Sequence, residues 1–317
     1  MSIAIETVKT GNIEMDYFRC GKEGGFPLAI IPGLSIKSVM ESAPAVAALY
    51  KPFADEFDIY VFDRRKNIPD TYSLEEMADD TAEAIKALGV TKVNFYGASQ
   101  GAIMVQLIAI RHPEIVNSIV LGSTAPRATK ESEAVVQNWI DLATMDTCKD
   151  LMLAFADKVY TAGFVNKYRD AFITMAGLVS QEELDKFRIL AGTLFGFDNT
   201  DKLQNIKCPA LVLGARNDQV FNYTLSEELA KGIGCDVYIY DSFGHAVYDE
   251  APDYVDRLHN FYTDHVNLQD TGTRHGDGSC PRVSKPPQSY FLVRCRFLNW
   301  SGVIANSFLK HAVMLPG

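Results

Sequence analysis

The sequence predicts an α/β protein whose mostly parallel, doubly wound sheet has helices on both faces. Strand-like and helix-like segments alternate before about residue 126 and again after about residue 204, as a parallel sheet requires. Some strand segments are apolar at consecutive positions, as in LAII at 28–31, which is typical of a strand buried on both faces. Between them, residues 127–203 show apolar residues at helical spacing and no clear strand. We therefore expect a core, 1–126 and 204–265, interrupted by a helical cap at 127–203.

The N-terminal elements follow from turn and capping signals. The expected order is a hairpin within 1–25 that turns at Thr10-Gly11-Asn12, the strand LAII, a helical segment over 37–54 and a strand at 57–65. Ser73 and Glu76 then form the S-x-x-E pattern of a capping box, which predicts the start of a helix. Gly89 is a good stop signal for that helix.

Residues 92–124 indicate a strand, a sharp turn, a helix and another strand, and the turn contains Ser99 between Gly97 and Gly101. A strand that runs directly into a helix leaves little room for side chains at the bend, and small flanking residues relieve that crowding. The residue at the turn is strained, and its side chain stands exposed above the sheet. A serine there is placed as a nucleophile, although so short a pattern also arises by chance in glycine-rich loops.

The C-terminal part of the core is expected to hold, in order, a strand and loop at 209–218, a helix at 225–233, a strand and loop at 236–245 and a helix at 252–266. A nucleophilic serine needs a base, and the base needs a carboxylate that fixes its tautomer. His245 is the one of six histidines that follows a core strand, and Gly244 before it permits an unusual backbone. Asp218 follows the preceding strand, and the order Ser99, Asp218, His245 is the one expected for this turn. Nearby alternatives to Asp218 are Asn217, Asp241 and Asp249.

Acyl transfer also needs two donors for the developing oxyanion, and backbone N–H groups usually serve. We expect one from Gln100, which follows the nucleophile at a helix N-terminus, where the helix dipole helps. We expect the other from the Pro32-Gly33-Leu34-Ser35 turn, and choose the N–H of Leu34. The side chains of Gln100 and Leu34 are expected to matter little to this role.

These motifs resemble the α/β-hydrolase fold superfamily, in its cap-bearing esterase, lipase and proline-iminopeptidase-like branch. The matching features span residues 27–265 and are IIPGLS, FDRR with the helix YSLEEMADD, GASQGA, HPEIVNSIVLGST, LVLGARND and DSFGHAVYDEAP. Two positions depart from the common pattern, because Pro32 stands where many members have His, and Ala102 where many have a second glycine. The fold hosts many chemistries, so the resemblance is specific for fold and triad but not for substrate.

The resemblance implies a two-step hydrolysis of a small carboxylic ester, thioester or lactone, with no metal or organic cofactor. Ser99 attacks the carbonyl as His245 takes its proton, and water activated by His245 then releases the acid. The same triad also serves carbon–carbon bond hydrolases, peptidases and cofactor-free perhydrolases, and some proteins of this fold bind a ligand without catalysis. A haloalkane dehalogenase is disfavoured, since it needs a carboxylate at the turn. A peptidase would need an acidic anchor, for which the insertion offers Asp141, Asp146, Asp150, Asp157, Glu182 and Glu183.

Composition and charge indicate which classes of partner the chain is not expected to bind. The chain has 317 residues, of which 47% are hydrophobic and 22% charged, and its net charge is −10. Such an acidic chain is not expected to bind nucleic acid, which needs a basic face. We expect no membrane span, since no apolar stretch of about 18 residues exists, and no signal peptide. Scattered cysteines without metal-like spacing favour reduced thiols and a cytoplasmic location, while oligomeric state is not predicted.

The last segment differs from the rest. Residues 266–317 hold six Lys or Arg against two Asp or Glu, a local charge of +4, whereas residues 1–265 hold 24 against 38, or −14. Its first part is rich in Gly, Ser, Pro and Thr, which predicts a linker or disorder. A basic tail could bind a partner or a membrane surface. Because the predicted fold is complete near residue 265, we favour a dispensable, non-native extension.

Overall fold

The structure is a computed structural model that describes residues 3–145 and 147–270. Its strands are β1 (Ile5–Thr10), β2 (Ile13–Gly21), β3 (Phe26–Ile31), β4 (Phe57–Arg65), β5 (Val93–Ala98), β6 (Val116–Gly122), β7 (Ala210–Ala215) and β8 (Asp236–Tyr240). They form one sheet in the order β1-β2-β4-β3-β5-β6-β7-β8. The six strands from β4 to β8 along this order are parallel, whereas β2 pairs antiparallel with both β1 and β4. The predicted mostly parallel α/β sheet is confirmed.

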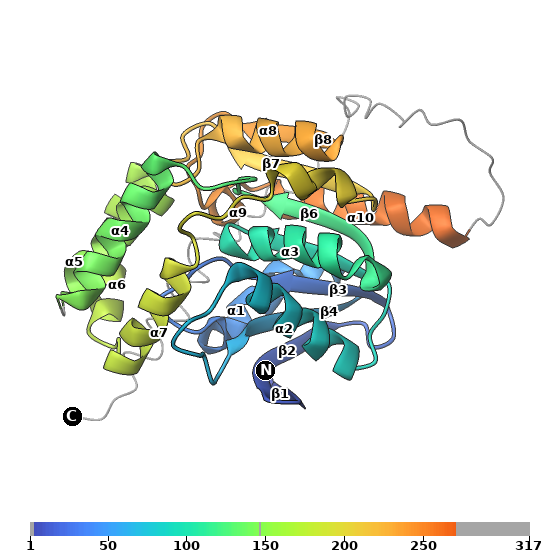
Figure 1. Ribbon diagram of the computed structural model, residues 1–317, viewed down its shortest axis with the longest axis horizontal. Coiled ribbons are helices and arrows are strands. Elements are labelled where there is room, and N and C mark those ends of the chain that lie inside the picture. The colour runs from blue at the N-terminus through green and yellow to red at the C-terminus, as the bar shows by residue number, and fades with distance from the viewer. Residues whose placement is uncertain (1–2, 146, 271–317) are drawn as a thin grey trace.

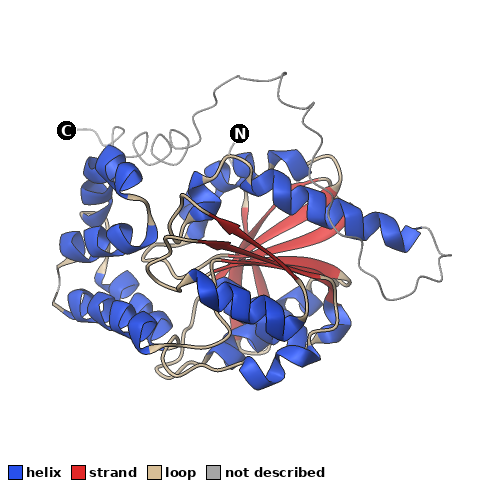
Figure 2. Cartoon of the chain, turned by 90° about the horizontal axis from the view of Figure 1, so that it is seen from above, coloured by secondary structure: helices blue, strands red, loops and turns tan. Residues whose placement is uncertain are grey.

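The α-helices are α1 (Ala43–Leu49), α2 (Leu74–Ala87), α3 (Gln100–Arg111), α4 (Lys130–Thr144), α5 (Cys148–Val159), α6 (Ala162–Ala176), α7 (Gln181–Gly192), α8 (Tyr223–Ile233), α9 (Val247–Glu250) and α10 (Tyr254–Asp270). Short 3₁₀ turns are η1 (Val39–Ser42), η2 (Lys51–Phe53), η3 (Pro113–Ile115) and η4 (Thr200–Asn205). Helices cover both faces of the twisted sheet (Figures 1 and 2). Helices α2, α3 and α8 contribute to the apolar core on one face, and α1 and α10 to the core on the other.

Strand β5 shows how the sheet divides these two cores. Successive side chains of a strand point to opposite faces. Accordingly, Phe95 belongs to the core under α2 and α3, while Tyr96 belongs to the core under α10. The hydroxyl of Tyr262 on α10 donates to the carbonyl of Phe95 at 2.7 Å, which fixes α10 across the sheet. The strand that leads into Ser99 is therefore held from both faces.

The predicted capping box is present at the start of α2. The backbone N–H of Glu76 donates to Ser73 Oγ at 3.1 Å, and the N–H of Ser73 donates to Glu76 Oε2 at 2.8 Å. Gly89 follows the helix with a φ of +71°, a conformation that glycine adopts without strain. Both local signals were therefore read correctly from the sequence.

Two helical predictions need correction. The segment predicted as one helix over 37–54 is broken into η1, α1 and η2, because Pro44 and Pro52 each start a new helical piece. The last helix, predicted over 252–266, runs as α10 to Asp270, and the single-turn helix α9 was missed. One helical turn is too short for its apolar periodicity to be recognised.

Between β6 and β7 the chain forms α4–α7, which gather beyond the carboxyl ends of the parallel strands (Figure 1). This segment has apolar contacts of its own, since the Trp139 and Phe155 rings lie 4.6 Å apart and Phe155 and Phe187 lie 6.2 Å apart. The division of the chain into a core and a cap stays a prediction, and the tail predicted from residue 266 falls mostly on 271–317, outside the described residues. Within the described ranges, no helix has the length and apolar character needed to cross a bilayer.

Candidate active site

Ser99 occupies the turn between the end of β5 and the start of α3. Its φ of +53° and ψ of −121° are costly for a residue with a side chain, and such strain persists only where neighbours enforce it. The N–H of Ser99 donates to the carbonyl of Gly122 at 2.8 Å, and Thr124 Oγ1 donates to the carbonyl of Ser99 at 3.2 Å. The end of β6 thus holds the strained residue on both sides.

The glycines that flank Ser99 have no room for a side chain. A Cβ on Gly97 would lie 2.6 Å from the Cα of Ala102, and a Cβ on Gly101 would lie 2.1 Å from the carbonyl oxygen of Ile31. The first contact keeps β5 close to α3, and the second keeps α3 close to the end of β3. The close approach inferred from the sequence is therefore present at both positions.

Ser99, His245 and Asp218 form a continuous hydrogen-bonded chain. His245 Nε2 lies 2.9 Å from Ser99 Oγ, and His245 Nδ1 lies 2.8 Å from Asp218 Oδ2. The three residues are 7%, 3% and 8% exposed, respectively. Asp218 Oδ1 accepts hydrogen bonds from the N–H groups of Val220 and Phe221, both at 2.8 Å, so the carboxylate is fixed in its orientation.

The three alternatives to Asp218 make other contacts. Asp241 forms an ion pair with Arg216 at 2.9 Å, and Asn217 Nδ2 donates to the carbonyl of Asp241 at 3.3 Å. Asp249 accepts a hydrogen bond from the Tyr160 hydroxyl at 3.0 Å. Of the four polar residues considered, the structure therefore places Asp218 against His245.

The backbone conformation of Gly244 differs from the one predicted. Its φ lies outside the left-handed region, so no unusual backbone explains it. Instead, a Cβ there would lie 3.3 Å from the carbonyl oxygen of Val159, and that carbonyl accepts a hydrogen bond from the N–H of Ala246 at 2.8 Å. The glycine lets the end of α5 approach the His245 loop, a contact between distant segments that the sequence pattern does not reveal.

The segments that carry the two predicted oxyanion donors both lie next to Ser99. Gln100 is the first residue of α3, and an N–H at that position has no acceptor within its own helix. A Cβ on Gly33 would lie 3.1 Å from the Cβ of Ser99, so the turn that contains Leu34 lies against the serine. The side chain of Gln100 is fully buried and bonded to Arg64, a residue that the sequence did not single out.

A small apolar cavity of about 20 Å³ borders Ser99 and His245. Its other lining residues are Leu34, Trp139, Phe155, Val159, Leu194, Val220 and Tyr248. Four of these come from the segment between β6 and β7, so this segment closes the site. Periodicity marks such residues as apolar but cannot say which of them face the serine.

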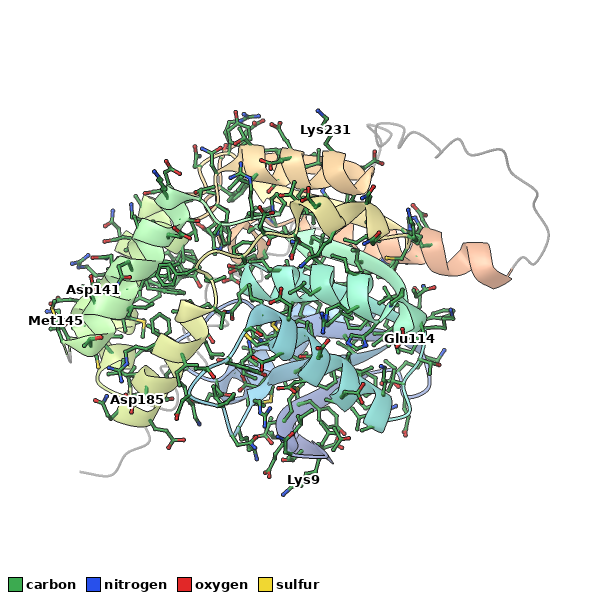
Figure 3. The ribbon with its side chains drawn as sticks, viewed as in Figure 1. Lys9, Glu114, Asp141, Met145, Asp185 and Lys231 are labelled. Carbon is green, nitrogen blue, oxygen red and sulfur yellow. The ribbon has the colours of Figure 1, made fainter. Side chains whose placement is uncertain are left out.

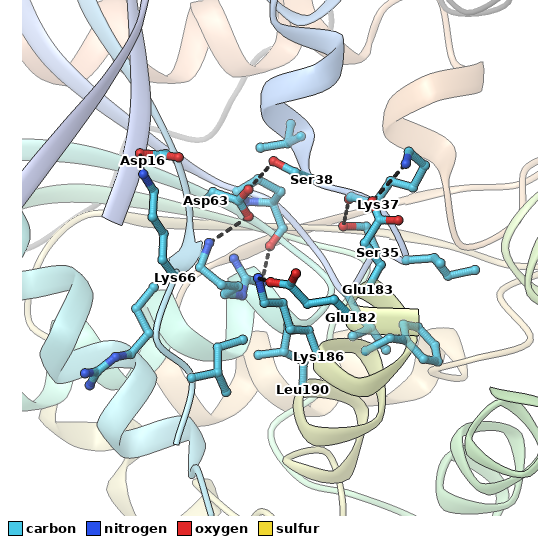
Figure 4. Close-up of a pocket in the computed structure, with 18 of the residues that line it drawn as sticks. Asp16, Ser35, Lys37, Ser38, Asp63, Lys66, Glu182, Glu183, Lys186 and Leu190 are labelled. Carbon is cyan, nitrogen blue, oxygen red and sulfur yellow. Dashed lines mark hydrogen bonds and ion pairs between the residues drawn. The ribbon is translucent and has the colours of Figure 1, made fainter. Parts of the chain in front are cut away.

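A second, larger cavity of about 530 Å³ is lined in part by the turn formed by Pro32, Gly33 and Leu34. Figure 4 shows charged side chains around it, several of them already paired. The ion pairs are Lys37 with Glu183 at 2.8 Å, Lys66 with Asp16 at 2.8 Å and Lys186 with Glu182 at 2.7 Å. Arg64 and Gln100 also line this cavity, whereas Ser99 and His245 do not. Leu34 borders both spaces.

Asp249, four residues after His245, provides a pH-dependent prediction. Burial raises the pKa of Asp249 from its ordinary value to about 7. Between about pH 4 and pH 7, Asp249 therefore keeps a proton in the folded protein that it has lost in the unfolded chain. Raising the pH through this range lowers the free energy of unfolding, because the folded protein must then give up that proton or hold a buried charge. Asp249→Asn cannot ionise yet still accepts from Tyr160. We expect its melting temperature relative to wild type to be higher at pH 8 than at pH 5.

The control for this measurement is Asp170→Asn, on an exposed part of α6. Its melting temperature should differ from wild type by the same amount at both pH values. An equal difference for Asp249→Asn at pH 5 and pH 8 would contradict the assigned cause.

The sequence is similar to known enzymes of one family. A family model described as alpha/beta hydrolase fold matches residues 30–252. A protein of Rhizobium rhizogenes named "Putative carbamate hydrolase RutD" is 28% identical over 214 residues, which are 65% of this chain and 80% of that protein. The 3-oxoadipate enol-lactonase 2 of Acinetobacter baylyi is 23% identical over 176 residues, which are 53% of this chain and 64% of that protein.

Solved structures agree on the fold. The enol-lactonase from Burkholderia xenovorans LB400 superposes with a TM-score of 0.71 at 21% identity, covering 81% of this chain and 100% of that one. At 21% identity, the similarity to this structure shows the fold alone. The match to the family model, in contrast, covers more than half of the chain. The chain therefore belongs to the alpha/beta hydrolase fold family of enzymes, as the motifs around Ser99 predicted.

Proposed function

We propose that this enzyme is a serine hydrolase that cleaves a small carboxylic ester, thioester or lactone through an acyl-enzyme. Ser99 is the nucleophile, His245 the general base and Asp218 the carboxylate that orients it. The observation that carries the proposal is the hydrogen-bonded chain from Ser99 Oγ to His245 Nε2 at 2.9 Å and from His245 Nδ1 to Asp218 Oδ2 at 2.8 Å. A base and its orienting carboxylate in this geometry are what an alcohol nucleophile requires.

The proton transfers follow from this arrangement. As Ser99 Oγ bonds to the carbonyl carbon, its proton moves to His245 Nε2, and the carbonyl oxygen becomes an oxyanion. His245 then gives the proton to the departing oxygen or sulfur, leaving an ester on Ser99. A water molecule that loses its proton to His245 attacks this ester, and the same proton returns to Ser99 Oγ as the acid leaves. Asp218 stabilises the imidazolium in both steps.

The oxyanion is assigned to the N–H groups of Leu34 and Gln100. Gln100 starts α3, so the positive end of the helix dipole faces the charge that develops at Ser99. The Gly33–Leu34 turn lies against Ser99, with the 3.1 Å approach at Gly33 described above. Two donors fixed by the backbone can stabilise the tetrahedral intermediate without reorganising during the reaction.

We assign substrate selection to a helical cap at 127–203. The cavity beside Ser99 has room for about one water molecule, so an acyl group must displace apolar side chains of this segment to enter, and a short one displaces the fewest. Relatives named as a carbamate hydrolase and an enol-lactonase make carbamates and lactones the first compounds to screen beyond simple esters.

A peptidase is less favoured, since the cavity beside Ser99 is not lined by any acidic residue of the insertion that the structure describes. Of the acidic candidates, Asp141, Asp150 and Asp157 are exposed. Glu182 and Glu183 line the larger cavity, where each is paired with a lysine. Figure 3 shows Asp141 on the outer side of α4, away from the sheet.

The test is hydrolysis of p-nitrophenyl acetate, butyrate and laurate by the wild-type protein, with labelling by a fluorophosphonate probe in parallel. We expect labelling, and a higher kcat/KM for acetate and butyrate than for laurate, because the cavity is small. A folded protein that neither hydrolyses these esters nor takes up the probe would contradict the proposal and favour a ligand-binding role. A preference for laurate would contradict only the assignment of a short acyl group.

A further inference from the structure

Arg64 is the second-last residue of β4, and it contacts both segments that carry the assigned oxyanion donors. Its Nη2 donates to the carbonyl oxygens of Pro32 at 2.7 Å and Gly33 at 3.4 Å. The same nitrogen donates to Gln100 Oε1 at 3.0 Å. One guanidinium nitrogen thus connects the turn that holds one oxyanion donor with the residue that holds the other.

The contact with Gly33 bears directly on Leu34. The carbonyl of Gly33 and the N–H of Leu34 belong to one planar peptide unit, so fixing the carbonyl fixes the direction of the N–H. A positive charge beside the carbonyl also polarises this peptide, which makes the N–H a stronger donor. Arg64 therefore acts on the oxyanion through the backbone, without touching the substrate.

The other end of the Gln100 carboxamide bonds to the insertion. Gln100 Nε2 donates to the carbonyl of Leu190 at 2.7 Å and to Thr193 Oγ1 at 3.0 Å. Leu190 lies in the last turn of α7, and its carbonyl also accepts from the N–H of Thr193, at 3.3 Å, and from the Thr193 hydroxyl, at 2.8 Å. Thr193 directly follows the helix. Gln100 is 0% exposed, so both bonds of its Nε2 are shielded from water. The C-terminal end of α7 is thereby fixed to the residue after the nucleophile.

The guanidinium is held at an energetic cost. Arg64 Nε is buried and has no hydrogen-bond partner within the described part of the chain. Burial also lowers the pKa of Arg64 from its usual range. An unpartnered buried donor on a charged group calls for an explanation, and such groups often mark functional sites.

We propose that Arg64 and Gln100 are positioning residues that hold the oxyanion donors in place and join them to the end of α7. The oxyanion hole is then fully formed only while α7 is seated on the core. This inference rests on the proposed serine-hydrolase function. It assigns to the Gln100 side chain a role that is separate from donation by its backbone N–H.

Gln100→Met is the decisive variant, because it keeps the backbone N–H and similar bulk but removes the carboxamide. With p-nitrophenyl butyrate we expect kcat to fall about 10- to 100-fold while KM changes less than about 3-fold, since transition-state stabilisation is lost. Affinity for a trifluoromethyl ketone, which forms a tetrahedral adduct, should fall in proportion to kcat/KM. Affinity for butyramide, an uncharged ground-state analogue, should change much less.

The matched control is Gln106→Met on the same helix. Gln106 is also 0% exposed, and its Nε2 donates to the carbonyl of Ala125 at 3.1 Å, away from the oxyanion turn. We expect this variant to lose stability without changing the ratio of ketone to butyramide affinity. An equal drop in kcat for both variants would show a general effect of losing a buried amide and would overturn the inference.

Two further variants keep the test decisive if Gln100→Met does not fold. Arg64→Lys keeps the charge, but its ammonium stops about one bond short of the Nη2 position from which all three acceptors are contacted, and we expect a similar loss of kcat and ketone affinity. Thr193→Val removes one bond to the end of α7 and should lower kcat about 3- to 10-fold. Folded variants with wild-type kcat and ketone affinity would refute the inference, whereas a wild type without esterase activity or probe labelling would refute the proposed function itself.

Discussion

Replacing Ser99 with alanine is expected to lower kcat for p-nitrophenyl butyrate by about 10⁴-fold or more, because no attacking oxygen is left. The residual rate should reflect only the oxyanion donors and substrate binding. Stability should change little, since among the described residues Ser99 Oγ bonds only to His245 Nε2. Initial rates under saturating substrate, together with a thermal melt of the same sample, measure both quantities.

Ser123→Ala is the matched control for this result. Ser123 is likewise a buried serine at the end of a strand with a positive φ, +48°, and its hydroxyl has no hydrogen-bond partner among the described residues. We expect wild-type kcat from this variant. A Ser99→Ala protein that is folded and retains more than about a tenth of the activity would be incompatible with a serine nucleophile at this position.

Replacing Gly101 with alanine is expected to destabilise the protein by about 3 kcal/mol or more, or to prevent folding. The added Cβ would lie 2.1 Å from the carbonyl oxygen of Ile31 and 2.4 Å from that of Pro32. These are backbone atoms at the end of β3, so relief requires shifting α3 or the turn that bears Leu34. Urea unfolding followed by circular dichroism gives the change in free energy of unfolding.

Gly163→Ala serves as its control, since a Cβ at Gly163 in α6 would meet nothing within 4 Å. Alanine stabilises a helix interior by about 0.5–1 kcal/mol relative to glycine, and Gly163 is the second residue of α6, so a gain no larger than this is expected. If Gly101→Ala unfolded at the same urea concentration as wild type, this result would contradict the close approach of α3 to the end of β3.

Local patterns predicted much of this molecule. Consecutive apolar residues in LAII marked β3, and the S-x-x-E pattern at Ser73 marked the start of α2. The hydrogen-bonded set was anticipated because Asp218 and His245 each follow a strand, and strands of a parallel sheet end at the same edge. Residues chosen by position along the chain were thus brought together by the topology of the sheet.

Contacts between distant segments could not be predicted in the same way. The bonds from Gln100 to Arg64 and to Leu190 join residues on three elements, and no periodicity links them. The role of Gly244 was misjudged for the same reason, since the neighbour that requires a glycine is Val159 on the insertion. A single sequence shows that the residues of α4–α7 are apolar or polar, but not which of them face Ser99.

The most direct measurement is the site of a covalent adduct. The wild-type protein is mixed with a fluorophosphonate, or acid-quenched during turnover of p-nitrophenyl butyrate, then digested and analysed by tandem mass spectrometry. We expect a single modification, on Ser99, that is absent from Ser99→Ala. An adduct on any other residue, or turnover by an enzyme that resists the phosphonate and shows no acyl group on Ser99, would contradict the assignment of Ser99 as the nucleophile.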